Sequence, residues 1–119
     1  MSNRKSLIMI VALLVLLTAI PSMALQEGQA RFVVARTLYV AGTEVQAGVY
    51  NVKWQSENQE ADVTFEPVGK TGGITVKGTL EEVDKKFNLN SVAIGKDSQG
   101  RDAILQLQFS GKKIRINFD

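Results

Sequence analysis

The chain has 119 residues, with 14 Lys and Arg against 12 Asp and Glu, and it contains no His and no Cys. The missing Cys and His exclude disulfides, the usual zinc sites and the Ser-His-Asp and Cys-His arrangements of nucleophilic catalysis. The formal net charge of +2 is too small to indicate a nucleic-acid or anionic-membrane partner.

The first 24 residues are predicted to be a secretory signal peptide. Arg4 and Lys5 form a short positive region, residues 7–20 form an apolar run, and Pro21 ends that run. Small residues lie three and one positions before the bond that follows Ala24, which suits cleavage there. The run of 14 residues is shorter than the ~20 needed to span a bilayer, which argues against a membrane anchor. After cleavage removes this run, we expect no stable membrane insertion.

Residues 25–119 are therefore expected to be the exported chain, a single β domain of 95 residues in the periplasm or outside the cell. Cleavage removes Arg4 and Lys5, which leaves 12 basic residues against 12 acidic ones and makes the exported chain formally neutral. Because it has no disulfides, its stability must come from apolar packing and a well-paired sheet.

In the first half of the domain, period-two alternation predicts three strands. Residues 31–40 alternate, but their phase also points Arg36 inward, so a bulge near Ala35 or Arg36 is expected. A glycine-bracketed loop, residues 42–48, precedes the next strand. The two strands after it alternate cleanly, residues 49–55 with Tyr50, Val52 and Trp54 inward and residues 61–67 with Ala61, Val63 and Phe65 inward.

The second half is predicted to add four more strands. Residues 73–82 alternate, and a single helical turn is the only helical candidate, over residues 81–86. Residues 87–94 start with Phe87 and Leu89 inward and switch phase near Ser91. The last two strands are residues 103–109, with Leu105, Leu107 and Phe109 inward, and residues 113–118, with Ile114, Ile116 and Phe118 inward.

Polar, glycine-bearing turns separate these strands, at residues 56–60, 68–73 and 95–102, with a tight turn at Ser110-Gly111. Short connections favour antiparallel pairing of strands that follow one another in the chain. The sequence therefore predicts an all-β fold, an antiparallel meander of about seven strands that forms a small barrel or a two-layer sandwich.

Two loops carry patterns that point to chemistry, and each is better explained as a turn. Gly69-Lys70-Thr71 lacks the glycine that a phosphate-binding loop needs five positions earlier, and a strand follows it where that motif needs a helix. Residues 95–102 carry the oxygen ligands that calcium prefers, but their spacing does not fit an EF-hand and two basic residues lie among them.

The remaining polar residues give no catalytic, metal-binding or cofactor-binding prediction. Lys112, Lys113 and Arg115 form the only basic cluster, but Lys113 and Arg115 alternate with apolar neighbours and face away from them, so no nucleic-acid partner is expected. The carboxylates fall in turns or at water-facing strand positions. The chain is therefore not expected to be an enzyme.

Four aromatic residues are candidates for a ligand or partner surface: Tyr39, Tyr50, Trp54 and Phe65. The alternative is that they belong to the core. For Trp54, the only tryptophan, the shared face with Tyr50 and Val52 predicts a largely buried side chain next to Phe65 on the following strand.

The segment "VAGTEVQAGVYNVKW" resembles a motif, AGxYxVxW, of small exported β-proteins from soil bacteria such as acidobacteria. Gln46 stands where those proteins usually have a proline. The resemblance implies an exported β fold and carries no assigned activity. The matching residues are Gly42, Gly48, Tyr50, Val52 and Trp54, followed by Phe109, Gly111, Lys112 and Phe118.

The sequence thus predicts a small exported, non-enzymatic β domain that is a binding or structural protein of the envelope, with an unknown partner and no cofactor. The alternative is a lipocalin-like carrier of a small apolar ligand in a barrel interior. A cavity lined by Tyr50, Trp54 and Phe65 would favour the carrier.

Overall fold

The computed structural model describes residues 25–118, so the predicted signal peptide, residues 1–24, lies outside the described part of the chain. Nine strands form there: β1 (Gln26–Val34), β2 (Leu38–Val40), β3 (Thr43–Val45), β4 (Gly48–Ser56), β5 (Glu60–Pro67), β6 (Ile74–Glu82), β7 (Ser91–Lys96), β8 (Asp102–Gln108) and β9 (Ile114–Asn117). Residues 25–118 include no helix that is long and apolar enough to cross a membrane.

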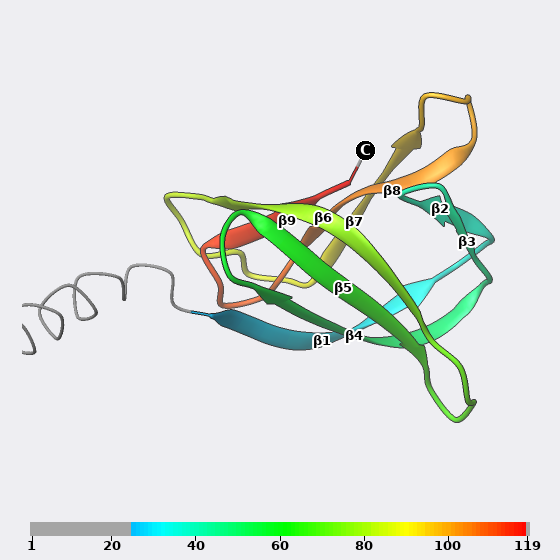
Figure 1. Cartoon of the computed structure of the whole chain (residues 1–119), viewed down its shortest axis with the longest axis horizontal. Helices are drawn as coiled ribbons and strands as arrows, with labels where there is room; N and C mark the ends of the chain where they lie inside the picture. Colours follow the sequence, from blue (N-terminus) through cyan, green and yellow to red (C-terminus); the bar gives the residue numbers. More distant parts are fainter. Residues whose placement is uncertain (1–24, 119) are drawn as a thin grey trace, which may run out of the picture.

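The nine strands belong to one sheet, in the order β1-β4-β5-β6-β9-β8-β2-β3, with β7 paired to β8. All pairs of the described strands are antiparallel except β2 with β8, which pair in parallel at Tyr39 and Ala103. An isolated parallel bridge also joins Phe87 and Ser110. Figure 1 shows the strands curving around a common interior, with β1 and β4 along one side and β8 and β9 along the other. The predicted all-β, mostly antiparallel class is confirmed.

The strands do not form the predicted simple meander. After β6 the chain crosses to β7, then passes through β8 and returns in β9 to pair with β6, which is a Greek-key order. The crossing segment is held by backbone bonds from the N–H of Phe87 to the carbonyl of Lys112, 3.1 Å, and from Gly111 to Phe87, 2.8 Å. The predicted helical turn is absent because Glu81 and Glu82 continue β6 and pair with β9.

The predicted barrel is not formed by the described residues, and neither is a sandwich of two separate sheets. Each successive pair along β1-β4-β5-β6-β9-β8-β7 is antiparallel, so the first and last strands of this series run in the same direction. An all-antiparallel barrel needs an even number of strands, and this series has seven. Among the described residues β1 pairs only with β4 and β7 only with β8, so the sheet is open between β1 and β7.

The predicted strand over residues 31–40 is two strands, β1 and β2. The chain bends at residues 35–37, where a bulge was expected, and Arg36 is exposed and pairs with Asp102 at 3.6 Å. The predicted loop that follows contains a short strand, β3, which forms a hairpin with β2. Ala41 and Gly42 make its two-residue turn with φ values of 47° and 82°, as a type I′ turn requires.

The core lies on the concave face of the sheet and confirms most of the predicted inward positions. The inward residues of β4, β5 and β9 are buried, including Val52, Phe65 and Ile116. The prediction for β8 is wrong at Leu105, which is only half-buried, whereas Ile104 is buried. The reason is a bulge, since Ala93 pairs with Gln106 and Ile94 with Ile104, which leaves Leu105 as an extra residue and shifts the phase of β8.

Candidate functional site

Three of the four aromatic candidates lie in the core. Tyr50, Trp54 and Phe65 are 8%, 5% and 0% exposed. The rings of Tyr50 and Phe65 meet edge to face with centroids 6.1 Å apart, and the Tyr50 hydroxyl donates to the carbonyl of Gln46 at 2.7 Å. The predicted burial of Trp54 is confirmed.

The neighbours of Trp54 differ from the predicted ones. Across the β4–β5 pair, Val63 lies opposite Trp54, while Phe65 lies opposite Val52. The aromatic partner of Trp54 is Phe109, with centroids 5.7 Å apart. On the other side its indole covers Gly28 of β1, where an added Cβ would lie 2.8 Å from Nε1. Glycine at this position therefore lets the indole lie against the backbone.

Tyr39, the fourth candidate, is half-buried on β2 and is not part of this aromatic group. The guanidinium of Arg101 lies 4.0 Å from the centre of its ring, in a cation–π contact. Tyr39 therefore belongs to a polar cluster at one end of the sheet, together with the β7–β8 loop. The structure does not bring the four candidates together on one surface.

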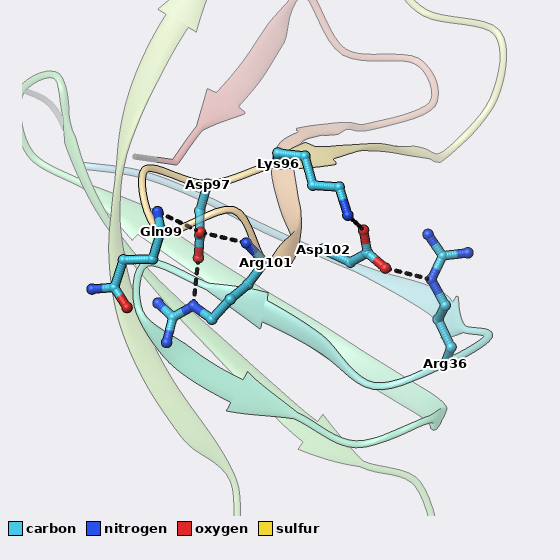
Figure 2. Close-up of polar contacts among 6 residues, drawn as sticks. All are labelled: Arg36, Lys96, Asp97, Gln99, Arg101 and Asp102. Carbon is cyan, nitrogen blue, oxygen red and sulfur yellow. Dashed lines mark hydrogen bonds and ion pairs between the residues drawn. The ribbon is translucent and has the colours of Figure 1, made fainter.

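The β7–β8 loop is organised by Asp97, as Figure 2 shows. One oxygen of Asp97 accepts hydrogen bonds from the backbone N–H groups of Gln99 and Arg101, both at 2.9 Å, and the other accepts from Arg101 Nε at 2.9 Å. These bonds, led by the Arg101 N–H, lower the pKa of Asp97 below its usual value. Both oxygens are thus used to hold the turn.

Asp102 closes the same cluster. It accepts a hydrogen bond from Lys96 Nζ at 2.6 Å and pairs with Arg36 at 3.6 Å, which ties the bend before β2 to the start of β8. The bond from Lys96 lowers the pKa of Asp102. Within residues 25–118 no group of three or more His, Cys, Asp or Glu residues is placed to hold a metal ion.

A polar ladder crosses the outer face of β6, β9, β8 and β7. Arg115 donates to both oxygens of Glu81, at 2.6 Å and 2.8 Å, and Asn117 donates to Glu81 at 3.1 Å. The Arg115 contact, with that of Asn117, lowers the pKa of Glu81 from 4.5 to about 2. Gln106 then donates to Asn117 at 2.8 Å, and Gln108 donates to Gln106 at 2.9 Å.

A shallow, open hollow lies on the outer face of β1, β4, β5 and β6. Four of its polar side chains are paired with one another: Lys53 with Glu66 at 3.0 Å, and the hydroxyls of Thr64 and Thr75 at 2.9 Å. These four side chains therefore bond to each other across the strands.

The free edge of β7 is unusually apolar for a strand edge that faces solvent. Ala93 and Ile94 are exposed, Ile94 to 47%, and Leu89 just before the strand is 74% exposed. This corrects the prediction for residues 87–94, where Leu89 was expected inward. Val92 is half-buried and packs against the core. Only Lys96, the last residue of β7, carries a charge.

The other free edges are better protected against pairing. β1 carries Glu27 and Arg31, and β3 has only three residues, one of them Glu44. Charges and short length are the usual means by which edge strands avoid another chain, and β7 has neither except at Lys96. A row of unpaired backbone N–H and C=O groups flanked by apolar side chains is chemically suited to pairing with another strand.

The free edge of β7 could not be predicted from the sequence, because it depends on the pairing order of the sheet. The one local signal was the absence of charge over residues 87–95. Comparisons of the chain with models of protein families, with curated proteins and with solved structures found no match.

Proposed function

We propose that the protein is a small exported β domain that acts by binding rather than by catalysis, and that its partner is a macromolecule of the envelope or the exterior. The observation that supports this best is the open edge of β7, which among the described strands pairs only with β8 and which carries the exposed Ile94. Main-chain pairing at such an edge would provide affinity, and the apolar side chains would provide selectivity.

The ionisation of three acidic residues agrees with a structural role for them. A general acid at neutral pH needs a carboxyl pKa that is raised. The carboxyls of Glu81, Asp97 and Asp102 have pKa values shifted downward, because each is held by basic side chains or backbone N–H groups. These residues serve to fix strands and a loop.

The packing of the interior favours binding at the surface over the carrier alternative. A carrier needs space beside its inward aromatic rings. Tyr50 and Phe65 contact each other, and Trp54 contacts Phe109, so these rings fill the concave side of the sheet.

The proposal is tested by recovering the protein from its native envelope after mild cross-linking and identifying what is attached by mass spectrometry. We expect a macromolecule to be cross-linked to the wild-type protein and to be lost from the Ile94→Lys variant. A Val33→Lys variant is the matched control, because Val33 is 69% exposed but lies on β1. Recovery of the wild-type protein with nothing attached, or with a small apolar molecule alone, would contradict the proposal.

A further inference from the structure

We propose that the open edge of β7 pairs with β7 of a second copy of this chain, so that two sheets join antiparallel about a two-fold axis. This inference rests on the proposed function, because it names the macromolecule that occupies the same edge. It starts from the pairing of the sheet, since among the described residues β7 pairs only with β8 and no strand lies along its other edge.

The charge pattern of β7 permits self-pairing. Like charges directly opposite one another destabilise a strand pair, and β7 has a single charged residue at one end. In an antiparallel pair of identical strands the two ends lie far apart, so the two Lys96 residues do not face each other. Each Lys96 is also neutralised within its own chain by Asp102 at 2.6 Å.

Symmetry restricts the register of such a pair. Hydrogen-bonded and non-hydrogen-bonded pairs alternate along an antiparallel ladder, so a two-fold axis has to pass where a residue faces its own copy. A register centred on Ala93 places Val92 opposite Ile94 of the second copy, twice, and places Lys96 opposite Asn90. A register centred on Ile94 instead places Val92 opposite Lys96. The first register is the one that joins the apolar residues.

The burial of these residues agrees with that register. Val92 is half-buried against the core, and Ile94, two residues along on the same face, is 47% exposed. Pairing centred on Ala93 covers Ile94 with Val92 of the second copy and extends the apolar face of the sheet across the axis. The bulge at Leu105 lies in β8, so β7 itself keeps a regular edge.

Sedimentation equilibrium of the protein expressed from the full-length chain tests this inference. We expect a concentration-dependent dimer for the wild-type protein and for Val33→Lys. Ile94→Lys should weaken the dimer by roughly tenfold or more, because two cross-strand apolar contacts are replaced by charges. A wild-type protein that stays monomeric at every concentration, or a dimer that Ile94→Lys leaves unchanged, would overturn the inference.

Cysteine cross-linking gives a second readout that does not depend on Ile94→Lys being folded. The chain has no cysteine, so a single introduced thiol reports one contact. In the proposed register an Ala93→Cys variant should form a disulfide-linked dimer under mild oxidation, and Val33→Cys should not. Equal cross-linking of both variants, or of neither, contradicts the register and the self-pairing with it.

The two proposals fail in different ways. If the protein is monomeric but a different macromolecule is cross-linked to it in the envelope and lost in Ile94→Lys, self-pairing is wrong and the binding function stands. If no macromolecule is cross-linked in the envelope, not even a second copy, the proposed function is wrong, whatever the purified protein does at high concentration.

Discussion

At the scale of single residues, Trp54 joins the two sides of the curved sheet. Its indole covers Gly28 on β1 and contacts Phe109 beyond the end of β8. These contacts link elements that are distant in the chain, so the loss of the ring removes packing from both sides at once. Trp54 is therefore the residue at which the stability of the core is most directly measured.

Replacing Trp54 by Ala should lower the free energy of unfolding by about 3–5 kcal/mol, because a large buried ring is lost and a cavity remains. Against a total of about 5–15 kcal/mol for a small domain, the variant is expected to be marginally stable. Urea denaturation measures the loss, and Trp54→Phe should lose less because it keeps a ring. In the wild-type protein the fluorescence emission of Trp54 should be blue-shifted, and iodide should not quench it. A quenchable indole together with an unchanged Trp54→Ala midpoint would contradict the core assignment.

Glu81 predicts a pH dependence of stability. The pKa of Glu81 is lowered from 4.5 to about 2 in the folded protein. Its contribution to folding stability is therefore complete above about pH 4.5 and is lost as the pH falls through about 2. The melting temperature of Glu81→Gln should lie below that of the wild-type protein at neutral pH. This difference in melting temperature should become smaller as the pH falls from about 4.5 to about 2. Glu82→Gln, altered at the next residue of β6, is the control. A gap that does not change with pH would exclude the ion pair with Arg115 as its cause.

At the scale of secondary-structure elements, the β2–β3 hairpin contains one residue that does not suit its backbone. Ala41 has a φ of 47°, in the left-handed region that costs about 1–2 kcal/mol for most residues. Ala41→Asn should raise the free energy of unfolding by up to about 1 kcal/mol, because Asn tolerates the left-handed region better than Ala and Asn-Gly is the preferred type I′ turn. Thermal unfolding checks this, with Ala47→Asn as control because Ala47 does not share the positive φ. If both variants change stability equally, the turn is not the cause.

The elements themselves could be predicted where a strand alternates and pairs along its whole length. Tyr50, Val52 and Trp54 identified the inward face of β4 because both neighbours, β1 and β5, pair with it in regular register. The short strand β3 was missed, since three residues give too little alternation to separate a strand from a loop. The bulge at Leu105 reverses the phase of β8, and residues 102–108 alone contain no pattern that predicts the bulge.

At the scale of the whole molecule, the candidate site was the least predictable feature. Aromatic residue type suggested Tyr50, Trp54 and Phe65, but residue type does not separate a binding surface from a core. The open edge follows from the pairing of β9 with β6, a contact between strands more than 30 residues apart. That long-range pairing places β7 at the end of the strand series. The alternation of apolar and polar residues along the chain does not predict it.

If residues 1–24 are a signal peptide, the protein recovered from the periplasm or the medium should begin at Leu25 or within a few residues of it. N-terminal sequencing checks this. Recovery of the protein from the cytoplasm with Met1 retained would contradict export and, with it, an envelope partner.

If this protein binds another polypeptide at the edge of β7, hydrogen exchange read by mass spectrometry should detect the new strand pairing. Within residues 91–96, the amides that do not bond to β8 should exchange quickly at low protein concentration. They should become protected at high concentration or when the protein is cross-linked in the envelope. Residues 26–34, on the free edge of β1, should exchange at the same rate throughout. Protection that appears on β1 or in the outer hollow, while the outer-edge amides of residues 91–96 stay unprotected, would contradict binding at the edge of β7.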